Sequence, residues 1–323
     1  MKKLLPLIIG LFCITNTIVA QKDSTQMVST WKTTNLGGSG VGDSSIYIHT
    51  DPNYTYNYDV DWNDDGIFDT LGLTQSIVHQ YPDTGTYTVR IRGTFPRVFF
   101  RAKGTPFAES SLKLIAFEQW GTTVWSRLDG AFRVANNMQY NATDTPNLSG
   151  VTDLSFMFSA NRINQFIGDI SNWNVSHITN MEGLLDLCLL FNQDLSGWDV
   201  SQVTNMAKMF SYTTVNFNLN AWDVSAVTDM EAMFESSQYN QALNSWNVSS
   251  VTDMGVMFIR SQFNQPLDAW DVSAVMNMKG MFFTSQFNLP LDAWDVSAVT
   301  NMRFMFYKSL LFNQSISSWD VSS

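Results

Sequence analysis

The sequence predicts an α/β solenoid with coils of about 24 residues, preceded by an all-β sandwich domain. The first observation is a tryptophan that recurs every 24 or 25 residues, at Trp173, Trp198, Trp222, Trp246, Trp270, Trp294 and Trp319. The second is a fixed set of apolar positions after each tryptophan, which one unit cannot bury alone, so that units must stack. The third is that residues 24–110 lack the period and read as short strands, at 45–49, 56–61, 76–80 and 86–92, separated by turn residues.

Each repeat is expected to combine a short strand, a short helix and a returning segment. With the tryptophan counted as zero, the unit of Trp222 has apolar residues at +2, +5, +8, +11, +12, +17 and +21. The spacing by three and four from +5 to +12 is typical of one face of a helix. Thr228 and Asp229 can cap the first turn of that helix. The alternation from Trp222 to Val224 indicates a strand that enters the coil.

Four segments are expected along the chain: a signal peptide over 1–20, a β-sandwich domain over 21–110, an amino-terminal cap over 111–150 and tandem repeats over 151–323. Residues 1–20 have a basic start, an apolar run and a small residue at the end, as secretory signals do. The protein is therefore predicted to be exported, to the cell surface or as a secreted protein. No later apolar run is long enough for a transmembrane segment.

Charge and residue types narrow the function classes. The 323 residues contain 18 Lys and Arg against 29 Asp and Glu, a formal net charge of −11, so that nucleic acid is not expected as a partner. Removal of the signal would leave Cys188 as the remaining thiol, among apolar residues. The three histidines form no pattern of nucleophile, base and orienting group, and we predict that the protein is not an enzyme.

Two polar rows accompany the repeats. An asparagine follows the +17 aromatic position in every unit, at Asn164, Asn192, Asn216, Asn240, Asn264, Asn288 and Asn313. We predict that this row is a buried structural ladder rather than a row of ligand contacts, because it does not vary within the chain. A second row of Asp or Asn follows each tryptophan, and we favour a turn or capping role for it over cation binding.

One segment of the β-domain has the spacing of a calcium loop. Asp61, Asn63, Asp65 and Asp69 provide oxygen ligands at positions 1, 3, 5 and 9, with Gly66 at the position of the sharp turn. Position 12 is Gly72, so that the bidentate glutamate of such loops is missing. The alternative is a polar hairpin turn, and calcium is the one cofactor for which the sequence gives any indication.

The repeat pattern W-[DN]-V-S-x-V-T-[DN]-M-x-x-M-F, followed by F-N-Q, resembles that of the BspA-like leucine-rich-repeat surface proteins. The resemblance covers about residues 112–323. It implies a leucine-rich-repeat-like, right-handed solenoid. The BspA-like proteins are bacterial surface proteins proposed to bind host matrix proteins or other cells, which implies an extracellular protein or glycan as partner.

The segment VHQYPDTGTYTVRIRG, together with YDVDW, resembles the β-sandwich domain of the polycystic-kidney-disease (PKD) type. The resemblance covers about 50 residues of the predicted β-domain. Domains of this type are usually spacers or contact proteins and glycans, and they bring no catalytic residues.

The sequence also predicts where a partner would bind. The +13 position, just after the Met-Phe pair, holds Ile259, Phe283 and Tyr307 on three successive coils, with Arg260 and Lys308 beside them. An exposed apolar stripe flanked by basic residues is typical of an interaction site. We predict a non-catalytic adhesion module that binds there. Two alternatives remain open: the side chains fold inward, or the protein is a structural spacer or coat component without a specific ligand.

Overall fold

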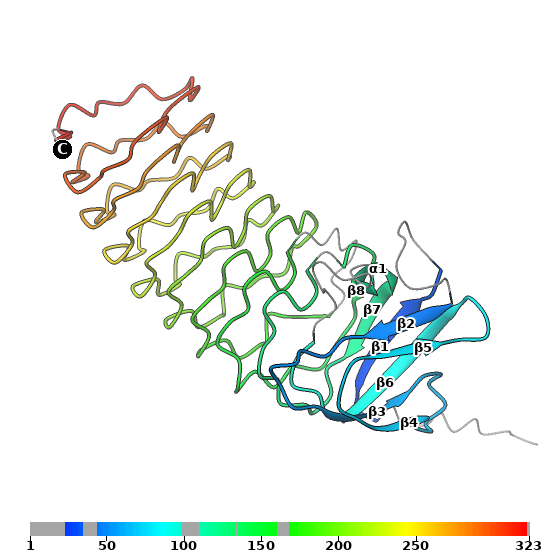
Figure 1. Ribbon diagram of the computed structural model, residues 1–323. Coiled ribbons are helices and arrows are strands. Elements are labelled where there is room, and N and C mark those ends of the chain that lie inside the picture. Colours follow the sequence, from blue (N-terminus) through cyan, green and yellow to red (C-terminus); the bar gives the residue numbers. More distant parts are fainter. Residues whose placement is uncertain (1–22, 35–43, 99–109, 134, 160–167, 322–323) are drawn as a thin grey trace, which may run out of the picture.

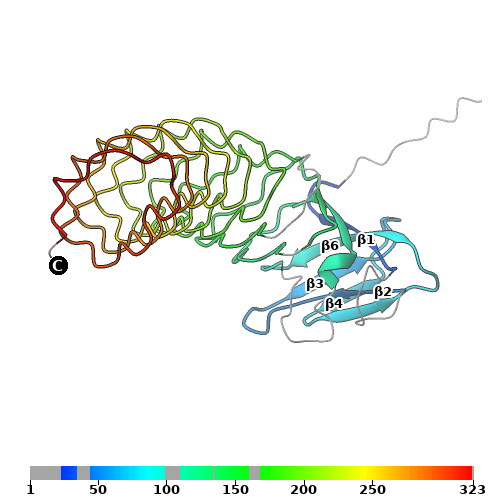
Figure 2. The same ribbon diagram turned by 90° about the horizontal axis from the view of Figure 1, so that it is seen from above.

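A computed structural model describes residues 23–34, 44–98, 110–133, 135–159 and 168–321. Figure 1 shows a β-rich part built from the amino-terminal strands, and a stack of coils that runs away from it to the carboxy terminus. Figure 2 shows the same coils one behind another. The signal peptide predicted over 1–20 lies outside the described residues.

The larger sheet has six strands in the order β4-β3-β6-β1-β7-β8. Its strands are β1 (Met27–Lys32), β3 (Asn57–Asp61), β4 (Thr70–Leu73), β6 (Thr86–Thr94), β7 (Leu114–Gln119) and β8 (Gln139–Tyr140). Every neighbouring pair is antiparallel except β7 with β8, which is parallel. The sheet therefore interleaves strands from both ends of the amino-terminal region.

The smaller sheet pairs β2 (Ser45–Ile48) with β5 (Ile77–Gln80) in antiparallel register. Apolar side chains of both sheets are buried in one core, in which Trp62 after β3 stacks on His79 of β5 with ring centroids 4.3 Å apart. The strands predicted at 45–49, 56–61, 76–80 and 86–92 are observed within one or two residues. β1, β4, β7 and β8 were not predicted.

The six-stranded sheet crosses the domain boundary predicted at residue 110. β7 lies in the predicted cap, yet it pairs with β1 of the β-domain. At the end of β7, the Gln119 side-chain amide donates to the carbonyls of Asp23 and Gln26, both at 2.8 Å. The start of the coil stack is thus built into the sheet.

Successive repeats stack on one another, and equivalent segments of neighbouring coils run in the same direction. Isolated parallel bridges join the +7 residue of each coil to that of the next, through Asp153, Asn180, Asn205, Asp229, Asp253, Asn277 and Asn301. Phenylalanines at +12 stack in a column, with ring centroids 5.6–5.8 Å apart from Phe210 to Phe306. The predicted apolar positions of the unit of Trp222 are all buried. Burial of this kind in every coil supplies the main stabilisation of the stack.

From Trp198 onward, the repeated tryptophan also makes a polar contact. The Trp246 indole N–H donates to the carbonyl of Leu219 in the preceding coil at 2.8 Å, and Trp270 does the same with Leu243 at 2.9 Å. The rings of Trp246 and Trp270 stack with centroids 6.3 Å apart. The repeated tryptophan therefore fills the core and satisfies a backbone acceptor that packing would otherwise leave without a partner.

The prediction of an α/β, leucine-rich-repeat-like right-handed solenoid is wrong, because the described part of the repeats contains no helix. Within the described residues the one helix is the four-residue α1 (Ser110–Lys113), which precedes the repeats. The stretch from +5 to +12 is instead a chain of turns. In the unit of Trp222, the Met233 N–H donates to the Met230 carbonyl at 3.2 Å, three residues back rather than four.

Every second N–H group of this stretch donates its hydrogen bond to the next coil rather than within its own coil. Met230, Ala232, Phe234 and Ser236 donate to carbonyls of the next coil at 2.8–3.0 Å, while Met233 and Glu235 donate within their own coil. This alternation requires a left-handed backbone at +10 and +14, and Ala232 and Ser236 have φ of 55° and 52°. A helix uses its N–H groups internally and is about 10 Å wide, so it cannot pair at a strand-like spacing of about 4.8 Å.

The same hydrogen-bond pattern begins one coil earlier than the sequence repeat indicates. In the predicted cap, Gly130 and Phe132 donate to the carbonyls of Ser155 and Met157 at 2.8 and 2.9 Å. Gly130 has the positive φ of the +10 position, at 60°, and Phe132 stacks on Phe158 at 5.6 Å. The cap is therefore partly a coil of the stack without its tryptophan period.

Candidate binding surface

A cluster of aromatic and basic side chains lies on the last two coils. The Phe283 and Tyr307 rings have centroids 5.2 Å apart, and Tyr307 meets Phe304 edge-on at 5.6 Å. Arg303 lies over the Phe304 ring at 4.6 Å, and the Lys308 ammonium lies 5.5 Å from the centroid of Tyr307. These five residues are called the aromatic–basic cluster below. Tyr307 is 49% exposed and Phe304 45% exposed.

The local backbone conformation places the side chains of this cluster at the surface. The Tyr307 N–H donates to the Phe304 carbonyl at 3.1 Å, which closes a turn between them. Phe304 and Lys308 occupy the +10 and +14 positions and have φ of 64° and 59°. The turn directs their side chains outward while Met305, between them, is buried. The repeat geometry thus produces a surface of two exposed rings and two cations.

The predicted stripe is only partly an exposed surface. Ile259 and Phe283 are half-buried, whereas Arg260, Tyr307 and Lys308 are exposed. The structure joins Phe283 and Tyr307 to Phe304 and Arg303, which the sequence reasoning did not include. Phe304 was missed because +10 was treated as an unremarkable helix position. A signal was present, since glycine occupies this position at Gly183 and Gly280.

On two earlier coils the +13 position holds the polar residues Asp186 and Ser211, which are more enclosed. Ser211 is 2% exposed, and Asp186 accepts a hydrogen bond from the Ser159 hydroxyl at 3.2 Å. Burial raises the pKa of Asp186, although hydrogen bonds from Ser211 and Ser159 favour its charged form. The row therefore changes character along the stack, from partly buried polar groups to exposed aromatic ones.

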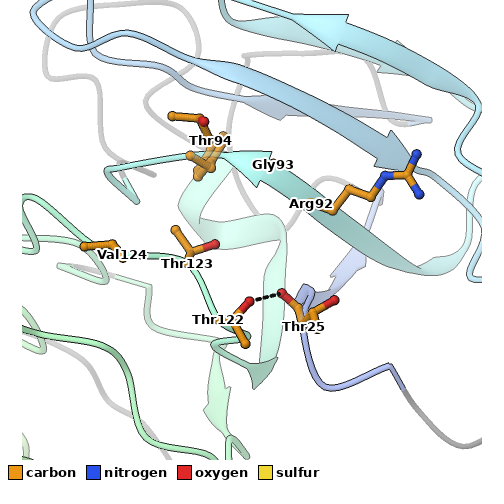
Figure 3. Close-up of a pocket in the computed structure, with 8 residues that line it drawn as sticks. Thr25, Arg92, Gly93, Thr94, Thr122, Thr123 and Val124 are labelled. Atoms are coloured by element: carbon orange, nitrogen blue, oxygen red, sulfur yellow. Dashed lines mark hydrogen bonds between the residues drawn. The ribbon is translucent and has the colours of Figure 1, made fainter.

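A hollow of about 400 Å³ lies where the sheet meets the coil stack (Figure 3). Its lining comes from the end of β6 and from residues 122–124, with Thr25 beside them. The Thr122 hydroxyl donates to the Thr25 carbonyl at 3.3 Å. Arg92, the charged residue of the lining, is bound to Asp59 at 2.9 Å and lies over the Phe68 ring. The hollow is thus lined by threonine hydroxyls and by an arginine that is already paired.

In the segment with calcium-loop spacing, the carboxylates accept hydrogen bonds from other groups of the same segment, mainly backbone N–H groups. The buried Asp61 carboxylate accepts N–H groups of Asn63, Asp64 and Gly66 at 2.8–3.2 Å. Asp69 accepts the N–H of Trp62 at 3.1 Å, and Asp65 accepts the side-chain amide of Asn63 at 3.1 Å. Among the described residues, no three His, Cys, Asp or Glu residues are grouped so as to hold a metal ion.

The asparagine row forms hydrogen bonds between coils, but it is not buried. The Asn216 side-chain oxygen accepts the backbone N–H of Asn240 at 2.9 Å, and the contact recurs from Asn240 to Asn264 at 2.8 Å. The next two steps reach Asn288 and Asn313 at 2.9 and 3.0 Å. Asn192, Asn216, Asn240, Asn264 and Asn313 are exposed and Asn288 is half-buried, while Asn164 lies outside the described residues. The expectation of burial is wrong for these positions.

The row after each tryptophan closes short turns. The Asp223 carboxylate accepts both the N–H and the hydroxyl of Ser225, at 3.0 and 2.6 Å. These bonds lower the pKa of Asp223, and Ser273 has the same effect on Asp271. The carboxylates are therefore held charged at the surface by their own turns.

Cys188 and His177, in the repeats, both contact backbone carbonyls of the fold. Cys188 is buried and its thiol contacts the Phe158 carbonyl at 3.1 Å. A ring nitrogen of His177 lies 2.6 Å from the Leu148 carbonyl. No helix in the described part of the chain has the length and apolar character needed to cross a membrane.

Comparisons with known proteins place the repeats in one family. Comparisons with curated proteins and with solved structures give no match. The family profile described as "Mycoplasma protein of unknown function, DUF285" matches residues 126–245 and 235–323. The first match begins just before the coil that starts with Leu128, and nothing in the comparisons supports the BspA-like or leucine-rich-repeat resemblance. Because the matches cover more than half of its length, the chain belongs to the DUF285 family.

Proposed function

We propose that this protein is an exported, non-catalytic binding module that attaches to an extracellular protein through the aromatic–basic cluster. The observation that carries the proposal is the exposure of Phe304 and Tyr307 side by side, with a cation over each ring. Large exposed aromatic side chains are favoured anchors of protein interfaces. Export rests on the secretory pattern of residues 1–20.

The charge of the cluster favours an acidic partner surface. Arg303 and Lys308 stand on a chain whose net charge is −11, so they form a local basic patch on an acidic molecule. Such a patch attracts carboxylates while the rest of the chain repels them, which fixes the orientation of the encounter. An acidic protein surface fits this patch, and an acidic glycan is the second candidate ligand.

A structural spacer is the competing function. Its support is the regular stack, in which polar side chains such as Asn240 and Asp223 serve neighbouring coils or their own turns. A spacer would need no exposed aromatic cluster, and apolar exposure without a partner carries a risk of aggregation.

The experiment compares the native chain with the double variant Phe304→Ser, Tyr307→Ser. Both proteins are tested against immobilised extracellular-matrix proteins and acidic glycans in surface-binding assays. We expect binding to a protein that falls at least tenfold in the double variant, because the anchors contribute most of such an interface. Leu189→Ser is the control, since Leu189 is 46% exposed on another coil. Equal binding by native and double-variant proteins would contradict the proposal.

A further inference from the structure

One lateral face of the coil stack is formed by the side chains at +9, +10, +13 and +14. Most of the aromatic–basic cluster occupies these positions on a single coil. Contacts between neighbouring coils join the same positions: the Lys208 ammonium lies 3.2 Å from a carboxylate oxygen of Glu231, and the Tyr212 hydroxyl donates to Glu235 at 3.1 Å. We call the surface that these positions form on the coils from Trp173 to Trp294 the charged face.

The first half of the charged face, on the coils from Trp173 to Trp222, is acidic. Its charged side chains are four carboxylates and one ammonium, those of Glu182, Asp186, Glu231, Glu235 and Lys208. The Lys208 ammonium lies 3.8 Å from Glu182 and 3.2 Å from Glu231, so that two carboxylates share it. The carboxylates of this half therefore exceed the cations that the chain itself supplies there.

The second half, on the coils from Trp246 to Trp294, is basic. It has no Asp or Glu at the four positions, and its charged side chains are Arg260, Lys279, Arg303 and Lys308. All four are exposed, and in the described part of the chain none of them forms an ion pair. Arg260 and Lys279 lie on coils that carry a further coil after them, so their exposure is a property of the lateral face.

A face that is acidic at one end and basic at the other is complementary to itself. A two-fold axis across the stack, between the coils of Trp222 and Trp246, reverses the second copy and sets equal positions of two coils opposite each other. Three pairs of opposite charge then meet: Glu182 with Arg303, Asp186 with Lys308, and Glu235 with Arg260. Lys279 faces Lys208, whose charge is already shared by two carboxylates.

Apolar side chains meet in the same arrangement. The exposed Leu187, at +14 on the coil of Trp173, lies opposite the exposed Tyr307 ring of the other copy. The half-buried Ile259 lies next to the axis in both copies. Apolar contacts that are flanked by charge pairs are the usual composition of a protein interface.

We propose that the charged face binds a second copy of this chain in antiparallel orientation, which gives a two-fold symmetric dimer. Parallel pairing would set acidic half against acidic half, which repels. Head-to-tail pairing would use one half of each face and leave the other half unpaired. The inference rests on the proposed function, since it uses the aromatic–basic cluster as a binding surface and identifies a second copy as an acidic protein that fits it.

Sedimentation velocity of the full chain tests the proposal at concentrations up to about 100 μM, a range in which weak interfaces are populated. We expect a concentration-dependent dimer. Arg260→Glu with Arg303→Glu, and separately Glu182→Lys with Glu235→Lys, should each raise the dissociation constant at least tenfold, because like charges then meet. An equimolar mixture of the two variants should dimerise about as tightly as the native chain, because each supplies the charges that the other lacks.

Asp268→Lys with Asp292→Lys is the matched control for the lysine variant. Both aspartates are exposed at +22, outside the charged face, so the same change in net charge should leave the dissociation constant within about twofold of the native value. Unchanged urea unfolding of every variant will show that the coils remain folded. A native chain that stays monomeric, or a mixture that dimerises no better than either variant alone, would overturn the proposal.

The lysine variant also separates this proposal from the proposed function, because Glu182 and Glu235 lie outside the aromatic–basic cluster. It should lose the dimer and keep the binding to an extracellular protein that the native chain shows. A native chain that dimerises as described but binds no such protein would contradict the proposed function and support the dimer. Binding to such a protein by a chain that does not dimerise would support the proposed function and overturn the dimer.

Discussion

At the scale of single residues, the backbone is set by the left-handed positions +10 and +14. Side chains other than glycine occupy most of them, including the β-branched Val256 and Thr284 with φ of 50° and 54°. An L-residue in this region costs about 1–2 kcal/mol. The coils accept this cost because the reversal sends the next N–H to the neighbouring coil, where it finds a carbonyl. The +10 glycines are the positions without that cost.

Replacement of Gly280 tests this cost directly. Gly280 has φ of 60°, and an added Cβ would lie 3.2 Å from the Cγ1 atom of Val256. Gly280→Ala should therefore lower the free energy of unfolding by about 1 kcal/mol, measured by urea unfolding. Gly197→Ala is the matched control, because nothing lies within 4 Å of its added Cβ. Equal stability of the two variants would show that the +10 conformation is not strained.

The exposed asparagine row gives a second residue-scale prediction. The Asn240 side-chain oxygen accepts the Asn264 N–H and the Gln265 amide at 2.8 and 3.2 Å. Because Asn240 is exposed, water can replace it, so Asn240→Ala should cost about 0.5–1.5 kcal/mol rather than the penalty of a buried group. Thermal unfolding measures the effect, and a loss above about 3 kcal/mol would show that the row is a buried ladder after all.

At the scale of the coil, half of the strands of the β-rich part were predictable, and the turn chain was not. Alternation and turn residues mark β2, β3, β5 and β6 in the sequence. In the repeats, the spacing of Val227, Met230, Met233 and Phe234 is that of a helix face, yet successive turns bury the same four residues. Periodicity reports which side chains face inward and does not distinguish these two backbones.

Prediction of the site was limited in the same way. The +13 stripe located Tyr307 and Lys308 correctly on the surface, but exposure of Phe304 depends on a φ that the periodicity does not encode. The calcium spacing of Asp61 to Asp69 is shared with turns, because the same oxygens that ligate a cation can accept backbone N–H groups.

Stacked carboxylates give the coil a pH dependence. Asp229 and Asp253 are bridge partners on adjacent coils, and burial, followed by the Asp253 charge, raises the Asp229 pKa. A raised folded-state pKa means that this group's contribution to stability is complete below the unfolded value of about 3.9 and is lost as pH rises through the folded value. The ionised Asp229 therefore destabilises the stack at neutral pH.

The variant Asp229→Asn should remove the destabilisation that the ionised Asp229 causes at neutral pH. The amide keeps the oxygen that accepts the Glu231 N–H at 2.9 Å, and Asn already occupies this position at Asn205 and Asn277. We expect the variant to be more stable than the native chain by about 0.5–1 kcal/mol at pH 7, with no gain below pH about 4. Urea unfolding from pH 3.5 to 7 measures the difference, and a gain that does not change with pH would contradict this account.

At the scale of the whole molecule, the stack is one-dimensional and has unequal ends. Its first coil is joined to the six-stranded sheet through β7 and contacts the β-rich part, while its last described coil carries most of the aromatic–basic cluster. Stability in such arrays is approximately a sum over neighbouring coils, so the stability of each coil depends on the coils beside it. The aromatic–basic cluster lies on the coils that are farthest from the six-stranded sheet.

The central structural claim is that the repeats pair coil with coil through alternate N–H groups rather than through helices. Scalar couplings across hydrogen bonds, measured by NMR on the deuterated protein, identify each donor with its acceptor. The structure predicts that the Phe258 N–H couples to the carbonyl carbon of Met281, and that of Val256 to Lys279. A coupling from the Phe258 N–H to the carbonyl of Met254, four residues back, would show a helix and contradict the account.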